Sequence, residues 1–472
     1  MRNAHYIDGR WVESLGRRRA DILDPATGTP CGQLTLGTAA DVDRAVAGAR
    51  QAFEAFSRTR VADRVALLEA ILAGYTARVD AFADALCREV GCPIDMARDA
   101  QAVAGVDHLR ATIAALEGFV WEERVGTHAI VREPIGVAAL ITPWNWPLNQ
   151  IVAKVAPALA AGCTMVLKPS EEAPGCAALF AEVLAEAGVP AGVFNLVQGD
   201  GTTVGAALAA HPQVDVVSFT GSTRAGIAVA QAAAPTVKRV HQELGGKAPA
   251  LVLASADLAA AVRATVGSVM FNSGQSCLAP TRLLVPEERY AEAVAIAREA
   301  VAATAVGDPK RPGGHIGPLV NRRQWEHVQR LIAGAIDAGA TLEAGGLGHP
   351  AGLERGFFVR PTLFSNVTPD MTIAREEIFG PVVTLIAFAD EEDAIRIANA
   401  TDYGLSAVVF GAPEDVRRVV PRLRAGMVYV NGGVPDPTMP FGGTKRSGNG
   451  REYGAHGIAE YLEVKSVLGA YA

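Results

Sequence analysis

Short apolar runs that alternate with helical segments restrict the fold of this chain more than any other feature. The runs of the first series are residues 135–141, 164–167, 193–197 and 214–219. Helical patterns of about ten to fifteen residues separate them. Because short buried strands that alternate with helices pair in parallel and are covered on both faces, the sequence predicts an α/β fold with a parallel sheet.

A second series of the same kind begins after Glu243. Its expected strands are residues 250–253, 281–285, 382–388, 405–410 and 427–430. A chain of 472 residues is too long for one hydrophobic core. Since no long linker or short repeat separates the two series, we expect two packed units with a boundary near Glu243 and a ligand site in the cleft between them.

The first part of the chain is expected to cover the first sheet. Residues 1–37 are polar and rich in turns, and helical patterns follow at residues 39–56, 61–79, 81–89 and 97–119. Residues 120–133 mix apolar, β-branched and charged side chains, as an exposed hairpin does. Such a hairpin could pair with another subunit or form a flap that faces solvent.

Charge and cysteine content argue against several classes of function. The formal net charge is −7 and the basic residues form no run longer than Arg17, Arg18 and Arg19, so we expect neither a nucleic-acid nor a membrane partner. The six cysteines form no C-x-x-C pair and have no histidine at zinc-like spacing, which indicates no metal site and no disulfide framework. Residues 1–13 lack the apolar centre of a secretory signal. We expect a soluble, cytoplasmic protein.

Cys277 and Glu243 are the candidate reacting residues. Cys277 ends the segment Phe-Asn-Ser-Gly-Gln-Ser-Cys, and Glu243 opens the segment Glu-Leu-Gly-Gly-Lys. A thiolate can form a covalent adduct with a carbonyl carbon, and a carboxylate can activate the water that releases the acyl group. Taken alone, a cysteine is more often a small buried hydrophobe and a glutamate more often a solvated surface charge.

Polar residues at the ends of the expected strands are candidates for ligand binding. Residues 219–226, Phe-Thr-Gly-Ser-Thr-Arg-Ala-Gly, follow a strand and open a helix, so Ser222 and the backbone N–H groups could hold a phosphate. The segment is neither a G-x-G-x-x-G fingerprint nor a P-loop, and a plain capped turn fits it equally well.

Lys168 and Glu171 could bind the two hydroxyls of a ribose, with the carboxylate repelling a 2′-phosphate. A lysine at a strand end and a capping glutamate are the alternative. Asn145, in Pro-Trp-Asn-Trp-Pro, could donate an N–H to a developing oxyanion or only satisfy the loop backbone.

Seven segments together resemble the aldehyde dehydrogenase superfamily. They are Pro-Trp-Asn at 143–145, Lys-Pro-Ser-Glu at 168–171, Phe-Thr-Gly-Ser at 219–222, Glu-Leu-Gly-Gly-Lys at 243–247, Gly-Gln-Ser-Cys at 274–277, Glu-Ile-Phe-Gly-Pro at 377–381 and Pro-Phe-Gly-Gly at 440–443. They occur in the family's order and span most of the chain. The resemblance implies NAD(P)-dependent oxidation of an aldehyde to a carboxylic acid.

The resemblance also implies roles for individual residues. Cys277 would attack the aldehyde to give a thiohemiacetal, whose oxyanion Asn145 and the Cys277 backbone N–H would hold. Loss of a hydride to the cofactor would leave a thioester. Glu243 would then activate the hydrolytic water, with Lys154 assisting proton exit. Members that transfer the acyl group to coenzyme A typically lack this glutamate, so Glu243 favours hydrolysis.

Cofactor and substrate contacts are implied in the same way. The cofactor positions are Trp144, Lys168, Glu171, Gly221, Ser222, Leu244, Gln324, Glu377 and Phe379. The substrate-tunnel positions are Trp146, Asn149, Gln150, Ala153, Ser276, Leu278 and Phe441. Glu171 favours NAD, with NADP possible. Because Ala153 leaves room in the tunnel and no arginine is present to hold a carboxylate, we expect a medium or long, apolar or aromatic aldehyde.

The family fold divides the chain into two packed parallel-sheet domains and small oligomerisation elements. Residues 1–115 and 136–245 would form a Rossmann-like NAD-binding domain, and residues 246–458 the catalytic domain. Residues 116–135 and 459–472 would form a hairpin and a tail that join subunits into a homodimer or homotetramer.

Two other functions compete with this interpretation. A thiol hydrolase would use Cys277 on esters without a redox step, but it would not need the cofactor residues. A structural or binding protein could keep the fold and lose Cys277 or Glu243, and both are present.

Overall fold

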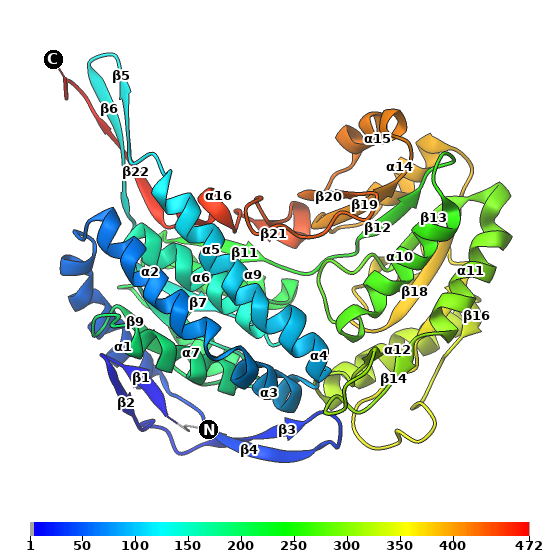
Figure 1. Cartoon of the computed structure of the whole chain (residues 1–472), viewed down its shortest axis with the longest axis horizontal. Helices are drawn as coiled ribbons and strands as arrows, with labels where there is room; N and C mark the ends of the chain where they lie inside the picture. Colours follow the sequence, from blue (N-terminus) through cyan, green and yellow to red (C-terminus); the bar gives the residue numbers. More distant parts are fainter. Residues whose placement is uncertain (1–3, 472) are drawn as a thin grey trace.

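The computed structural model describes residues 4–471, which form two lobes and a projecting arm (Figure 1). An eight-stranded sheet in the order β2-β1-β9-β8-β7-β10-β11-β21 forms the centre of the first lobe. Its strands are β1 (His5–Ile7), β2 (Arg10–Val12), β7 (Val137–Ile141), β8 (Thr164–Lys168), β9 (Phe194–Leu196), β10 (Val216–Thr220), β11 (Arg239–Glu243) and β21 (Gly448–Asn449). The five strands from β9 to β11 pair in parallel, which confirms the predicted α/β class.

Helices bury both faces of this sheet, because alternate residues of each strand point to opposite sides. Val137, Ala139 and Ile141 pack with one group of helices, and Ala138 and Leu140 pack with the other. The first group is α1 (Ala39–Phe56), α8 (Ala206–Ala210) and α9 (Thr223–Ala233). The second group is α2 (Val61–Thr76), α3 (Val79–Val90), α5 (Val103–Glu117), α6 (Pro147–Ala161) and α7 (Pro174–Glu186).

A seven-stranded sheet in the order β16-β17-β18-β13-β12-β19-β20 forms the second lobe. Its strands are β12 (Pro249–Val252), β13 (Arg282–Pro286), β16 (Thr341–Ala344), β17 (Thr362–Ser365), β18 (Val382–Phe388), β19 (Ser406–Phe410) and β20 (Met427–Val430). All pairs are parallel except β16 with β17. One face is covered by α10 (Leu258–Met270) and α11 (Tyr290–Ala302), and the other by α12 (Arg322–Asp337), α13 (Thr372–Arg375), α14 (Glu391–Asn399) and α15 (Pro413–Val419).

The segment after the second sheet returns to the first lobe. β21 pairs with β11, and α16 (Gly454–Ala459) packs on α5 and α6. The range 246–458, expected to form the catalytic domain, therefore contributes one strand and one helix to the other lobe. This return places β21 at the edge of the first sheet, next to β11.

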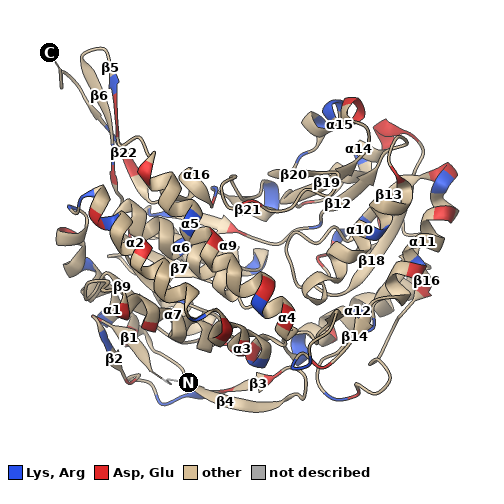
Figure 2. Cartoon of the chain, viewed as in Figure 1, with Lys and Arg blue, Asp and Glu red and all other residues tan. Residues whose placement is uncertain are grey.

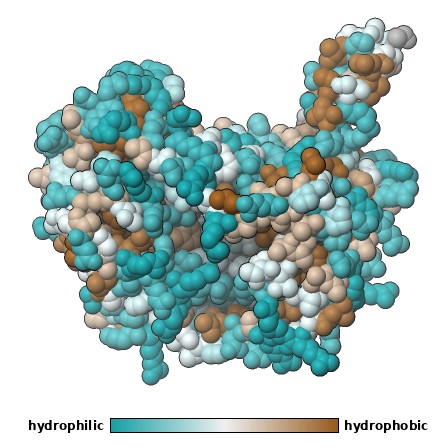
Figure 3. All heavy atoms as spheres, turned by 180° about the vertical axis from the view of Figure 1, so that it is seen from behind, coloured by the Kyte–Doolittle hydropathy of each residue, from teal (hydrophilic) through white to brown (hydrophobic). Residues whose placement is uncertain are grey.

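The arm is a three-stranded antiparallel sheet in the order β22-β6-β5, and the C-terminus lies near its tip (Figure 1). Its strands are β5 (Glu122–Val125), β6 (His128–Pro134) and β22 (Leu462–Val467). Apolar residues gather on the arm in the view from behind (Figure 3). The exposed large apolar side chains here are Val120, Val125, Val464, Val467 and Leu468.

Several elements differ from the sequence-based prediction. The turn-rich N-terminal segment contains β1, β2 and the hairpin of β3 (Arg19–Asp24) and β4 (Thr29–Thr35). The helical pattern at 61–79 ends earlier, because α2 stops at Thr76 and α3 begins at Val79. β11 was not predicted at all, since Arg239, His241 and Gln242 interrupt its apolar pattern.

Acidic and basic residues are interspersed along the chain (Figure 2). Many form exposed ion pairs, including Arg78 with Glu186 and Arg418 with Glu391. Exposed pairs of this kind contribute little to stability. Among residues 4–471, no helix is both long and apolar enough to cross a membrane.

Candidate active site

Cys277 lies on the loop that follows α10, after a turn with an unusual backbone. Asn272, Ser273 and Gly274 all have left-handed conformations, with φ of 54°, 56° and 74°. Two of these residues are not glycine, so contacts elsewhere must offset the strain of the turn. Position 274 requires glycine, since a Cβ there would lie 2.0 Å from the carbonyl oxygen of Gly380. The turn therefore fixes the path of the chain that leads to the thiol.

Asn145 comes from the first lobe and contacts this loop directly. Its side chain is 5% exposed, and its Nδ2 donates a hydrogen bond to the carbonyl oxygen of Gln275 at 3.0 Å. Beside it, Nε1 of Trp146 donates to Oγ of Ser276 at 2.9 Å. An asparagine amide has two N–H donors, so one remains for an oxyanion formed next to Cys277.

The Cys277 side chain is half-buried beside a cluster of apolar side chains. The cluster consists of Ala153, Leu405, Phe441 and Tyr453, with Leu278 and Met427 packed against it. Burial raises the pKa of the Cys277 thiol above its usual range, and the carboxylates of Glu377 and Glu243 raise it further. Such a thiol is mostly protonated near neutral pH and needs a base to become a nucleophile.

Glu243 is the last residue of β11, and its side chain is only 4% exposed. Neither carboxylate oxygen has a hydrogen-bond partner among the described residues. Burial raises the pKa of Glu243 well above its ordinary value, the charge of Glu452 raises it further, and Lys154 opposes the shift. The backbone of Gly442 lies against the carboxylate, because a Cβ at 442 would be 2.7 Å from Oε1 of Glu243. An unpartnered carboxylate with a raised pKa is suited to take a proton from water.

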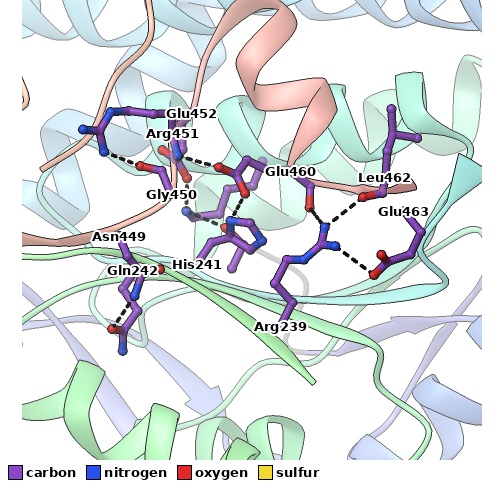
Figure 4. A network of polar contacts seen from close by, with 12 residues as sticks. Arg239, His241, Gln242, Asn449, Gly450, Arg451, Glu452, Glu460, Leu462 and Glu463 are labelled. Atoms are coloured by element: carbon purple, nitrogen blue, oxygen red, sulfur yellow. Dashed lines mark hydrogen bonds and ion pairs between the residues drawn. The ribbon is translucent and has the colours of Figure 1, made fainter. Parts of the chain in front are cut away.

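A polar network, part of which is drawn in Figure 4, shares a small cavity with Glu243. Lys154 of α6 is fully buried, donates to Oγ of Ser218 at 3.0 Å and forms an ion pair with Glu452. Nδ1 of His241 contacts the carboxylate of Glu460. A small cavity runs among these groups, lined by Ala153, Ser218, His241, Glu243, Asn449, Arg451, Glu452, Gly457, Glu460 and Tyr461. Polar side chains around such a cavity can hold water next to Glu243.

Lys168 and Glu171 form an ion pair at the carboxyl end of β8. Nζ of Lys168 lies 3.0 Å from Oε2 of Glu171, and the carboxylate is 38% exposed while the lysine is buried. The neighbouring Glu172 accepts a hydrogen bond from Nδ2 of Asn321 at 2.7 Å, which joins this loop to the start of α12. Gln324 lies in the first turn of α12 and is partly exposed there.

The strand-to-helix turn at Gly221 and Ser222 presents a helix N-terminus. Ser222 is exposed and caps α9, with its Oγ accepting from a backbone N–H at 3.3 Å. Leu244 packs against Gly226 of this helix, where a Cβ would lie 2.6 Å from the leucine. Helix N-termini attract anions, so this turn can hold a phosphate group.

Glu377 lies close to the chain that follows Glu243. The backbone N–H of Gly246 donates to its Oε1 at 2.9 Å, and a Cβ at Gly245 would lie 2.4 Å from its Oε2. Burial raises the pKa of Glu377 from 4.5 to about 7. The rings of Trp144 and Phe379 meet edge to face with their centroids 5.5 Å apart. A dinucleotide has two riboses and a pyrophosphate, and groups suited to each are present here. Glu377 and the Lys168–Glu171 pair could bind ribose hydroxyls, and the N-terminus of α9 could bind the pyrophosphate.

Asn149 of α6 forms a polar patch with two residues that the sequence did not suggest. Its Nδ2 is 3.0 Å from Nε2 of His108, and the Tyr453 hydroxyl donates to its Oδ1 at 3.3 Å. The Tyr453 ring also packs on Phe441, with centroids 4.7 Å apart. Burial lowers the pKa of His108 to about 4, so its imidazole is neutral near neutral pH. Gln150 is buried, and its side-chain oxygen has no partner in residues 4–471.

The structure adds buried polar side chains around the candidate reactive residues that the sequence analysis did not single out. Asn272 stands in the segment that ends at Cys277 but was given no role. Tyr453, His108 and Gln101 lie in segments whose pattern is explained by a helix or a turn alone. Glu452 is missed for the same reason. In the described part of the chain, no group of three His, Cys, Asp or Glu side chains is placed to hold a metal ion.

Comparison with known proteins gives a consistent result over the whole chain. A protein-family model described as the aldehyde dehydrogenase family matches residues 11–467. A 3-succinoylsemialdehyde-pyridine dehydrogenase from a Pseudomonas species is 52% identical over 466 residues, covering 98% of each chain.

Solved structures agree with this match. An aldehyde dehydrogenase from Bartonella henselae has a TM-score of 0.97 at 44% identity, covering 100% of this chain and 99% of the other. A mutant of aldehyde dehydrogenase C from Pseudomonas syringae, crystallised with NAD+ and octanal, has a TM-score of 0.98 at 50% identity, covering 99% and 97%.

Proposed function

This chain belongs to the aldehyde dehydrogenase family, and we propose that it oxidises a medium-sized or long, apolar or aromatic aldehyde through a thioester on Cys277. One observation carries the cysteine mechanism. The loop of Cys277 is hydrogen-bonded to Asn145, and the unpartnered carboxylate of Glu243 lies against the backbone of Gly442, next to Phe441 of the apolar cluster beside Cys277.

The first half of the proposed reaction forms the acyl-enzyme. Glu243 or a water accepts the thiol proton, and the Cys277 sulfur attacks the aldehyde carbon to give a thiohemiacetal. The free N–H of the Asn145 amide and the backbone N–H of Cys277 hold the oxyanion. When NAD is bound, it accepts the hydride that leaves this carbon. The carbon is thereby oxidised to the thioester on Cys277.

The second half releases the acid. The carboxylate of Glu243 takes a proton from a water as the water oxygen attacks the thioester carbon, and the C–S bond breaks to return the Cys277 thiolate. The cavity beside Glu243 would give the proton a route past Glu452, which shares an ion pair with Lys154. A raised pKa lets Glu243 hold this proton before passing it on.

Cofactor binding is assigned to the groups around the first sheet. Lys168 and Glu171 would hold the adenosine ribose, and Ser222 with the N-terminus of α9 would hold the pyrophosphate. Glu377 would bind the ribose of the nicotinamide half. Trp144, Gly221, Leu244, Gln324 and Phe379 would complete the site. A partly exposed Glu171 carboxylate would repel a 2′-phosphate, which supports a preference for NAD over NADP.

The substrate assignment rests on the apolar cluster beside Cys277. Ala153, Phe441, Tyr453 and Leu278 offer apolar surface. Trp146 and Phe271 add aromatic rings, with centroids 5.8 Å apart. The Pseudomonas relative at 52% identity is named for a pyridine-bearing semialdehyde, and the Pseudomonas syringae structure at 50% identity contains octanal. Both names support a medium-sized or long, apolar or aromatic aldehyde as the substrate.

A panel of aldehydes tests the substrate and the cofactor together. We expect kcat/KM with NAD to rise from acetaldehyde to octanal by up to about 3,000-fold, since octanal has six more methylenes and each buried methylene contributes about 0.8 kcal/mol. Aromatic aldehydes should also be faster than acetaldehyde. Aldehydes with a terminal carboxylate should be slower than uncharged ones of equal length. NADP should give a higher KM than NAD. Equal kcat/KM for acetaldehyde and octanal, or preference for the carboxylated series, would contradict the assignment.

The arm is the proposed site of subunit contact. β5 is an edge strand, and an exposed strand edge with apolar side chains nearby can pair with another chain. We therefore expect the full chain to be a homodimer or homotetramer by sedimentation velocity. A monomer that persists at high protein concentration would exclude this role for the arm.

A thiol hydrolase without redox chemistry is a weaker alternative. The Lys168–Glu171 pair and the buried Glu377 have no use in ester cleavage. Absence of NAD binding by calorimetry, together with ester cleavage that needs no nucleotide, would favour it.

A further inference from the structure

Gln101 lies on a π-helical turn that faces the candidate active site. The turn, η1 (Ala97–Ala102), joins the short helix α4 (Ile94–Met96) to α5. π-Turns are rare and occur often at functional sites, because the wider turn redirects a side chain. The carbonyl of Ala102 at its end accepts a hydrogen bond from the buried Tyr75 hydroxyl at 2.8 Å, which fixes the turn from behind.

The Gln101 amide links Asn145 to the strained turn before Cys277. Its side chain is 1% exposed. Nε2 donates to the backbone carbonyl of Asn145 at 3.3 Å and to Oδ1 of Asn272 at 3.0 Å. Both N–H donors are therefore used, and Oε1 has no partner among the described residues.

Asn272 completes the link. Its Nδ2 donates to the carbonyl of Asn145 at 2.9 Å and to the carbonyl of Gln275 at 3.2 Å. The carbonyl of Asn145 thus accepts from two side chains, while its own amide donates to Gln275. Asn272 has φ of 54°, so its side chain reaches Asn145 only while the left-handed turn is kept. Gln101 holds Oδ1 of Asn272 and thereby holds this orientation.

We propose that Gln101 is a positioning residue that sets the Asn145 amide against Cys277 and so tunes the formation of the acyl-enzyme. This inference rests on the proposed function, in which Asn145 stabilises the oxyanion. Gln101 itself touches no reacting atom. Without it, the carbonyl of Asn145 and Oδ1 of Asn272 each lose a hydrogen-bond donor. The free N–H of Asn145 would then no longer be held toward the reacting carbon.

Gln101→Met is the first test, because methionine has a similar volume and no N–H donor. The rate of the NADH burst should fall between about 10-fold and 100-fold, since small misplacements of an oxyanion donor cost this much. The KM for NAD should not change. The rate of thioester hydrolysis in the Glu243-dependent step should fall less than the burst rate, because the proton acceptor is untouched.

Gln101→Glu gives a second signature. Its carboxylate would face two acceptors, the Asn145 carbonyl and Oδ1 of Asn272, so its burst rate should be lower than that of Gln101→Met at neutral pH. As pH falls and the carboxyl group gains a proton, one donor returns, and the ratio of variant to wild-type rate should rise. A ratio that is independent of pH would contradict a donor role.

A double-mutant cycle with Asn145→Ala decides whether Gln101 acts through Asn145. In the Asn145→Ala background, Gln101→Met should cost less than about 3-fold. The same fold loss in both backgrounds would overturn the proposal, while an Asn145→Ala variant as active as wild type would instead refute the proposed function.

Gln198→Met is the matched control, because Gln198 is also 1% exposed, donates to the Pro174 carbonyl at 3.2 Å and leaves Oε1 unpartnered. With saturating NAD, the control should match Gln101→Met in thermal stability and keep the wild-type burst rate.

Discussion

Alanine in place of Cys277 is expected to lower NADH formation with every aldehyde by about 10⁴-fold or more, because no covalent adduct can form without the sulfur. The cofactor groups lie on other segments, so the variant should still bind NAD with unchanged affinity by calorimetry. Rates of NADH formation at saturating NAD and aldehyde are the measurement.

Cys31→Ala is the matched control for this loss. Cys31 is also partly exposed, but it lies on β4 in the N-terminal hairpin. Its variant should keep wild-type activity. A Cys277→Ala protein that retained more than about a tenth of the wild-type rate would show that another group forms the adduct, or that none forms.

Glutamine in place of Glu243 is expected to separate the two halves of the reaction. Hydride loss itself does not need the carboxylate, and a water can accept the thiol proton in its place, so a burst of about one NADH per active site should remain. Hydrolysis needs a proton acceptor, and the steady-state rate should fall by about 10² to 10⁴-fold. Stopped-flow absorbance at saturating substrate measures both phases. Turnover at the wild-type steady-state rate would mean that another base activates the water.

The pH dependence of the two steps also tests whether Glu243 acts only in hydrolysis. Glu243 must lose its proton to act as a base, and burial raises its pKa above the ordinary glutamate range. Hydrolysis by the wild type should therefore increase with pH across a range well above 4.5, and the Gln variant should lose this increase. Glu89→Gln is the control, since Glu89 is 1% exposed with a raised pKa but lies outside the cavity.

Most of the fold could be predicted because the buried strands carry a complete apolar pattern. β7 and β8 are buried along their whole length, so their sequences indicate a parallel sheet without further information. β11 could not be found in this way, since it lies between β10 and the two-residue β21 near the sheet edge and its side chains make polar contacts. Arg239 and His241 contact Glu460, and Gln242 donates to the carbonyl of Gly226. The resemblance placed Glu243 in the site, whereas its position at a strand end came only from the structure.

The candidate site could be predicted from the sequence only through the family resemblance. Cys277 and Asn145 taken alone left other interpretations open, and the resemblance implied their roles as nucleophile and donor. The structure places the two residues on adjoining loops. Gln101 belongs to a pattern that reads as an ordinary helix. In the structure it lies in a π-helical turn, and its side chain is buried. Contacts between segments far apart in the sequence leave no local signal.

Mass spectrometry of the acyl-enzyme tests the central claim most directly. Glu243→Gln protein is mixed with NAD and octanal, quenched in acid and digested. The account predicts a peptide with an octanoyl group on Cys277, present in about one copy per active site and absent when NAD is left out. Two results would contradict the account: a Cys277 peptide that is unmodified although NADH has formed, and an acyl group on another residue.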